Sequence, residues 1–236
     1  MDYSSNLTFY RWINMSTVKS DTSHHCDNLE GSIKEAVEAD KDIRETVRCI
    51  TLKALSEGKL DLNEITQIAG RVVKGAGLGA HGRNSQDKLV KAVAGLDDAL
   101  CSAAEASKLA VEEASSHANT FSKQDLQRTL NDLSELEVMF LDTLKDVAKE
   151  ANEAVSGTLN DLARHGRVSG TAVGQKVTEI STLLNQQFSE RLSDTVTAGV
   201  DSAAKITSNL AYAAAGFLDA FAQKMDEKSA SNSFQN

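Results

Sequence analysis

Residues 77–82 read GLGAHG, which matches the G-x-G-x-x-G pattern of a dinucleotide-binding loop. Asp97 follows about twenty residues later, where such a loop has a carboxylate for the ribose hydroxyl. That motif requires a β-strand before it and a helix after it. The residues before Gly77 have helical spacing instead, and no segment has the pattern of a buried strand. We therefore expect a flexible glycine connector between helices, and no nucleotide cofactor.

Histidine and cysteine side chains provide the other candidates for chemistry. His24, His25 and Cys26 are adjacent, and adjacent residues rarely converge on one metal ion without further ligands. They also fall in a segment that we expect to be disordered. His117 is expected at a turn and His165 at a helix end, where histidine interacts favourably with the last carbonyls. These positions therefore predict neither a metal site nor a catalytic site.

Catalytic signatures are also missing from the sequence as a whole. No segment has a nucleophile elbow, an HExxH or CxxC pattern or a P-loop. The many aspartates and glutamates are explained by solvated helix faces. We predict that the protein is not an enzyme and has no cofactor, no metal and no small-molecule substrate.

Composition indicates an all-α protein. The 236 residues include no proline, the residue least tolerated inside helices, and only 5% are aromatic. The apolar residues are mainly alanine, leucine and valine, and alanine has the highest helix propensity. Small apolar side chains give a thin core, so we predict an elongated bundle of long amphipathic helices.

Charge and cysteine content restrict the partners and the compartment. The net charge of −9 argues against nucleic acid, because phosphate binding needs a basic field. Cys26, Cys49 and Cys101 are too few and too scattered for a disulfide scaffold, and they fit a reducing compartment. We expect a cytoplasmic protein, located at the periphery of granules or membranes.

The chain divides into five segments by its pattern. Residues 1–27 and 227–236 are expected to be disordered. Residues 28–82 predict short helices, with Asp61 and Glu64 as a capping box and Gly75 as a helix end, before the glycine-rich connector. Residues 83–165 predict an antiparallel hairpin of two long helices, the first beginning near Ser85. In the second helix, a single residue, Glu137, interrupts the heptad pattern.

Residues 166–226 predict a long amphipathic C-terminal helix. Gly166, Gly170 and Gly174 lie four residues apart at its start. This spacing fits a smooth stripe on a continuous helix that packs closely against a neighbour. It equally fits a junction at which Gly166 ends one helix and Ser169 caps the next. Both alternatives place a helix junction between the hairpin and the terminal helix.

The apolar face of the C-terminal helix is the main functional indication. Its opposite face is rich in Ser, Thr, Asn and Gln and poor in Lys and Arg, which is typical of helices that insert into loosely packed lipid surfaces. The same pattern also fits a helix whose two faces are partly buried in a homo-oligomer. The residues predicted to bind the surface or a partner chain are Leu184, Phe188, Leu192, Val196, Ile206, Leu210, Phe217 and Phe221.

Residues 85–226 resemble the phasins, which are small, acidic, alanine-rich and proline-poor helical proteins that coat polyhydroxyalkanoate granules. The resemblance is one of composition and pattern, and it implies granule binding through amphipathic helices together with oligomerisation. Two functions remain open from the sequence. The protein is either an amphipathic coat on a hydrophobic granule or membrane surface, or a self-assembling helical scaffold.

Overall fold

A computed structural model describes residues 22–57, 61–116 and 123–189 of the chain. Within these ranges the regular structure is entirely helical, which confirms the all-α prediction. The helices are α1 (Thr22–Glu38), α2 (Ile43–Ser56), α3 (Leu62–Gly79), α4 (Ser85–Ser116), α5 (Lys123–Glu150), α6 (Glu153–Ser169) and α7 (Ala172–Ser189). Residues 227–236 lie outside the described residues.

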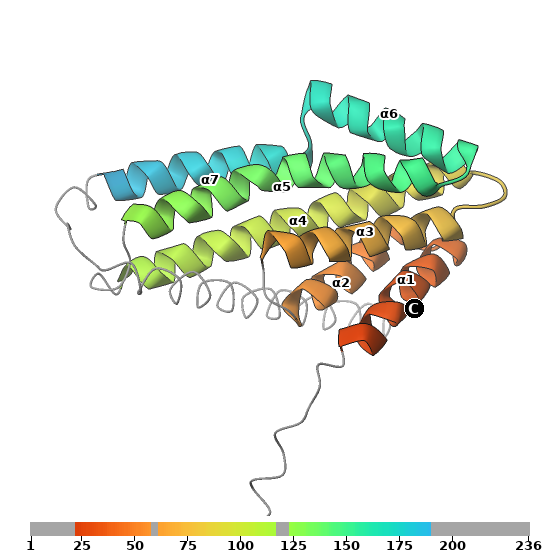
Figure 1. The fold of residues 1–236 in the computed structure, drawn as a ribbon, viewed down its shortest axis with the longest axis horizontal. Helices are drawn as coiled ribbons and strands as arrows, with labels where there is room; N and C mark the ends of the chain where they lie inside the picture. The colour runs from red at the N-terminus through yellow and green to blue at the C-terminus, as the bar shows by residue number, and fades with distance from the viewer. Residues whose placement is uncertain (1–21, 58–60, 117–122, 190–236) are drawn as a thin grey trace, which may run out of the picture.

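The long helices α4 and α5 run side by side in opposite directions and set the length of the bundle (Figure 1). At 1.5 Å per residue, the 32 residues of α4 span about 48 Å. Direct contact between α4 and α5 is limited, because α3 and α7 each pack against both of them. Helix α2 packs on α4, α1 packs on α3, and α6 packs on the outer side of α5.

Local capping explains several helix starts. The Asp61 side chain accepts a hydrogen bond of 2.8 Å from the Glu64 backbone N–H, which confirms the predicted cap of α3. Asn152 caps α6 in the same way through the Val155 N–H, at 3.1 Å. The second long helix therefore ends at Glu150 instead of continuing to residue 165, because Asn152 begins a new helix.

The N-terminal boundary and the glycine connector both differ from the predictions. Helix α1 begins at Thr22, earlier than the expected start near Asn28, and it includes His24, His25 and Cys26. Helix α3 continues past Gly75, its predicted end, to Gly79, so the first half of the predicted connector GLGAHG is helical. A Cβ at Gly75 would lie 2.5 Å from the Glu30 carbonyl oxygen of α1, and one at Gly79 equally close to that of Lys34. These glycines let the backbones of α1 and α3 approach each other.

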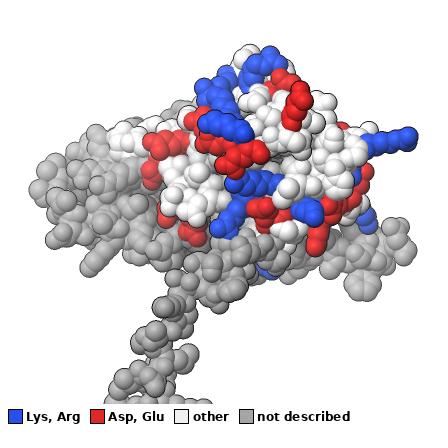
Figure 2. Space-filling model, turned by 45° about the vertical axis from the view of Figure 1, so that its right-hand side comes forward, with Lys and Arg blue, Asp and Glu red and all other residues white. Residues whose placement is uncertain are grey.

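The buried core follows the predicted helical stripes. Helix α4 buries residues at the four-and-three spacing of a heptad seam, namely Leu89, Val93, Leu96, Leu100 and Ala103, and α5 contributes Leu133, Phe140, Leu144 and Val147. Helix α7 contributes Val173, Val177, Ile180 and Leu184. On the face that Figure 2 shows, acidic and basic side chains lie among one another over the helices. The described residues on this face therefore form no large patch of one charge sign.

Candidate functional site

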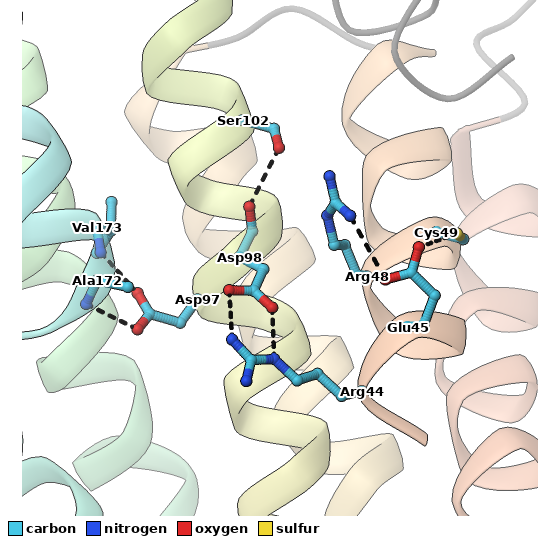
Figure 3. A network of polar contacts seen from close by, with 9 residues as sticks. All are labelled: Arg44, Glu45, Arg48, Cys49, Asp97, Asp98, Ser102, Ala172 and Val173. Carbon is cyan, nitrogen blue, oxygen red and sulfur yellow. Dashed lines mark hydrogen bonds and ion pairs between the residues drawn. The ribbon is translucent and has the colours of Figure 1, made fainter. Parts of the chain in front are cut away.

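Two acidic side chains from different helices converge on the start of α7. Asp97 of α4 accepts a hydrogen bond from the Ala172 backbone N–H at 3.0 Å and one from the Val173 N–H at 2.9 Å (Figure 3). The first N–H groups of a helix have no acceptor within the helix. The Asp97 carboxylate supplies the missing acceptors, and its negative charge interacts favourably with the positive end of the α7 dipole.

Glu137 of α5 completes the junction through the residue that precedes α7. One of its carboxylate oxygens accepts hydrogen bonds from the Thr171 backbone N–H at 3.0 Å and from the Thr171 hydroxyl at 2.8 Å. The Thr171 hydroxyl oxygen in turn accepts the Gly174 N–H at 3.0 Å, so Thr171 is the N-cap of α7. We call Asp97, Glu137 and Thr171 the α7 clamp.

Burial gives the Asp97 carboxylate an unusual electrostatic position. Loss of hydration raises the pKa of Asp97 above its ordinary value, and the hydrogen bonds from Val173 and Ala172 offset only part of this effect. The neighbouring carboxylates of Asp98 and Glu137 raise the pKa of Asp97 further. The charge of Asp97 is therefore held at the junction at an energetic cost.

The residues around the clamp connect α4 to α2 on the opposite side (Figure 3). The Arg44 guanidinium of α2 donates hydrogen bonds of 2.6 Å and 2.8 Å to the two carboxylate oxygens of Asp98. Hydrogen bonding to Asp98 raises the pKa of Arg44. Desolvation, together with the charges of Asp97 and Asp98, raises the pKa of the Cys101 thiol to about 12. Cys101 is therefore a protonated, weakly nucleophilic thiol at neutral pH.

Glycine is required at each of the three junction positions for a different structural reason. A Cβ at Gly166 would contact Leu141 of α5 at 2.6 Å. Gly170 follows the last residue of α6 and has φ 78° and ψ 162°, a backbone conformation that is essentially restricted to glycine. At Gly174, the Glu137 carboxylate fills the space that a Cβ would need.

Of the two interpretations of this segment, the structure shows the break. The break lies at Gly170, since α6 continues through Gly166 to Ser169. Ser169 ends α6 and does not cap α7, because Thr171 has that role.

Leu184 is the one predicted surface-binding residue whose side chain the structure describes. It is fully buried, at 0% exposure, where α7 packs on α4 and α5, so it belongs to the core in this conformation. Phe188 lies in α7, but its side chain is outside the described part of the chain. The other predicted residues also lie outside it, namely Leu192, Val196, Ile206, Leu210, Phe217 and Phe221.

The other candidates do not gather at a site. Residues 80–82 of the GLGAHG motif follow the end of α3 at Gly79. His81 lies close to this helix end, with its Nδ1 3.3 Å from the Leu78 carbonyl oxygen. His165 is exposed near the end of α6, and His117 lies outside the described residues. Within the described ranges, no three His, Cys, Asp or Glu side chains are placed to hold a metal ion.

The sequence pattern singled out two of the three clamp residues, for other reasons, and missed Thr171. Asp97 stood out as the acidic partner of a nucleotide-binding motif, and Glu137 as the single interruption of a heptad seam. In the structure Asp97 accepts from the Val173 N–H and Glu137 from the Thr171 N–H, so both act at the start of α7. A polar residue that interrupts an apolar seam was thus a usable signal, although it did not identify its partner.

Comparison with known proteins relates the chain to one family. None of the helices in the described ranges has the length and apolar character needed to cross a membrane. No curated protein and no solved structure matches the chain. A family model matches residues 19–227, and the chain therefore belongs to the family of unknown function DUF6781.

Proposed function

We propose that this protein is a non-enzymatic, amphipathic helical protein that coats a hydrophobic surface, such as a storage granule or a membrane, in the cytoplasm. In this proposal the residues after α7 bind the surface and the helical bundle carries them. The observation behind the proposal is the position of α7 relative to the end of the bundle. The apolar stripe of α7 continues in the sequence beyond that end.

The geometry of α7 supports this argument. Helix α7 begins beside Asp97 of α4 and runs in the same direction as α4 (Figure 1). From Ala172 to Ser189 the helical rise is about 25 Å, and from Asp97 to the end of α4 at Ser116 it is about 28 Å. The two helices therefore end at nearly the same level. In the sequence the apolar stripe continues after Ser189, whereas the described part of α4 ends at this level.

The sequence after Ser189 has the composition expected of a segment that binds a hydrophobic surface. Its apolar positions keep the helical spacing as far as Phe221, as in the stripe of α7. Basic residues are few between positions 190 and 226, namely Arg191, Lys205 and Lys224. A polar face with few basic residues favours insertion into a neutral, loosely packed surface over attraction to anionic lipid. The similarity to phasins supports a granule as one such surface.

Flotation of the full chain with neutral phosphatidylcholine vesicles and with polyhydroxybutyrate particles tests the proposal. We expect the protein to float with at least one of these surfaces, and Leu210→Asp to abolish the binding while the bundle stays folded. Ser208→Asp is the matched control. It adds the same charge two residues away, on the opposite side of a helix, so its flotation is expected to remain unchanged.

The alternative function, a self-assembling helical scaffold, predicts a different result. The stripe would then pack against another copy of the chain, and light scattering would give a fixed multiple of 25.3 kDa without any surface. Leu210→Asp would reduce that multiple, and neither vesicles nor granules would bind the protein. That combination would overturn the coat proposal.

A further inference from the structure

We propose that α7 is a detachable arm of the bundle, with Gly170 as its hinge and the α7 clamp as its catch. When the arm is released, Val173, Val177, Ile180 and Leu184 become available to a hydrophobic surface together with the apolar residues that follow. This last step rests on the proposed function. The opening of the arm does not depend on the proposed function, because it can occur in the free protein.

The hinge is defined by the two residues between α6 and α7. Gly170 is exposed and has a backbone conformation that few other residues adopt, and a Cβ built on it would meet no atom within 4 Å. Neighbouring atoms therefore do not exclude a side chain at position 170, and the glycine is required by its backbone conformation alone. Hinges in proteins are typically a few residues at element ends that absorb backbone rotations.

The catch acts at the end of α7 that lies next to the hinge. Thr171, Ala172 and Val173 donate four hydrogen bonds to the carboxylates of Asp97 and Glu137. Their acceptors belong to other helices, so all four break when α7 leaves. Water can replace each of them, because an opened first turn of α7 is solvated.

The electrostatics of the clamp favour a catch that can open. The raised pKa of Asp97 shows that its charge is less stable in the bundle than in water. Opening hydrates the Asp97 carboxylate and removes the cost of its desolvation. Part of the cost of breaking the hydrogen bonds is thereby offset.

The apolar residues of α7 lie on one side of the helix, so they can bind another hydrophobic surface together. Its four buried aliphatic residues form one stripe, and in the sequence the same stripe continues through Leu192 and Val196. The buried residues of α4 beyond Asp97 are mainly small, including Ala103, Ala104 and Ala110. A hydrophobic surface can therefore replace the contacts that α7 makes in the bundle.

Hydrogen exchange of the full chain in the absence of any surface tests the opening. We expect peptides that cover residues 170–180 to exchange through an opening that leaves α4 and α5 protected. Asp97→Ala removes two acceptors and is expected to accelerate this exchange about tenfold or more. Asp98→Ala is the matched control, because it removes the neighbouring carboxylate of α4, which pairs with α2 and not with α7.

Two results in the free protein would overturn the arm. One is exchange of α7 at the same rate as the core of α4 and α5, which would mean that α7 opens only by global unfolding. The other is an equal effect of Asp97→Ala and Asp98→Ala on α7, which would mean that the clamp has no specific role.

Exchange in the presence of neutral phosphatidylcholine vesicles then tests release onto a surface. We expect the amides of Ala172 and Val173 to lose protection on binding while α5 keeps its own. If the protein floats but these amides stay protected, the surface role of the arm is wrong and the coat proposal stands. If the protein does not float at all, the coat proposal fails, and the experiment on the free protein still decides whether α7 opens.

Discussion

The carboxylate of Glu137 occupies the space that the Cβ of any larger residue would need at position 174. The two residues come from α5 and α7, so Gly174 is small because Glu137 must reach Thr171. This relationship couples the identities of positions 137 and 174. It also explains why one acidic residue interrupts an otherwise apolar seam.

A double-mutant cycle measures this coupling. Gly174→Ala should lower the free energy of unfolding by about 1–3 kcal/mol, because the added carbon displaces the Glu137 carboxylate. In a Glu137→Ala background the same change should be close to neutral, since alanine favours a helix over glycine. Urea unfolding followed by circular dichroism gives all four stabilities. Equal costs in the two backgrounds would show that the steric relationship does not exist in solution.

The conformation of Gly170 predicts a second effect on stability. Gly170→Ala should cost about 1–3 kcal/mol, although a Cβ there has open space, because φ is positive with an extended ψ. Gly157→Ala is the control, since Gly157 is an exposed residue inside α6 that also has open space. It should stabilise the protein by about 0.5–1 kcal/mol. Similar values for the two variants in urea unfolding would argue against the described backbone at Gly170.

The close approach of α1 and α3 predicts a third effect. At Gly75 a Cβ would lie 2.5 Å from the Glu30 carbonyl oxygen and 3.0 Å from the Ile33 Cβ. Backbone atoms cannot move aside as a flexible side chain does, so Gly75→Ala should cost about 1–3 kcal/mol. Gly70→Ala in the same helix has no neighbour within 4 Å and should raise stability. If thermal unfolding shows the two variants to be equally stable, α1 does not pack on α3 as described.

The pKa of Asp97 predicts a pH dependence with a defined sign. A pKa that is raised on folding means that the folded chain binds the proton more tightly than the unfolded chain. The contribution of Asp97 to stability is therefore fully present below the ordinary Asp pKa of 3.8. It is lost as the pH rises through the raised pKa of the folded chain.

Comparison with Asp97→Asn isolates this contribution, because both proteins share every other titrating group. Across a pH series that begins near 3.8, the free energy of unfolding of the natural chain should fall relative to that of the variant. Urea unfolding at each pH provides the difference. A difference that grows in the opposite direction would mean that the hydrogen bonds from Ala172 and Val173 outweigh desolvation.

The sequence predicted the helical content and several helix starts because those features depend on neighbouring residues. The absence of proline, the Asp61–Glu64 pair and the spacing around Leu89 all act within one or two helical turns. The glycines could not be interpreted in the same way. Gly75 suits a helix end and Gly79 a flexible connector as well as each suits a close helix crossing, and only the position of α1 distinguishes these interpretations.

The α7 clamp could not be predicted from the sequence for a related reason. The sequence shows that Asp97 and Glu137 are polar residues near apolar seams, but nothing nearby indicates that they face the same helix start. Their common partner depends on how α4, α5 and α7 pack in three dimensions. The break at Gly170 was one of two interpretations of the glycine spacing. Choosing between them required the backbone angles of Gly170 and the contacts of Thr171.

The long sequence separation of the clamp has a consequence for how the chain folds. The Asp97 carboxylate and the Val173 amide are 76 positions apart, and Glu137 and Thr171 are 34 apart. Contacts between distant positions form late, because the entropy of closing the intervening chain must be overcome first. Helices α4 and α5 are both complete before α7 is synthesised, so its docking site can already exist when α7 leaves the ribosome. The order of synthesis thus favours assembly of the bundle before attachment of its final helix.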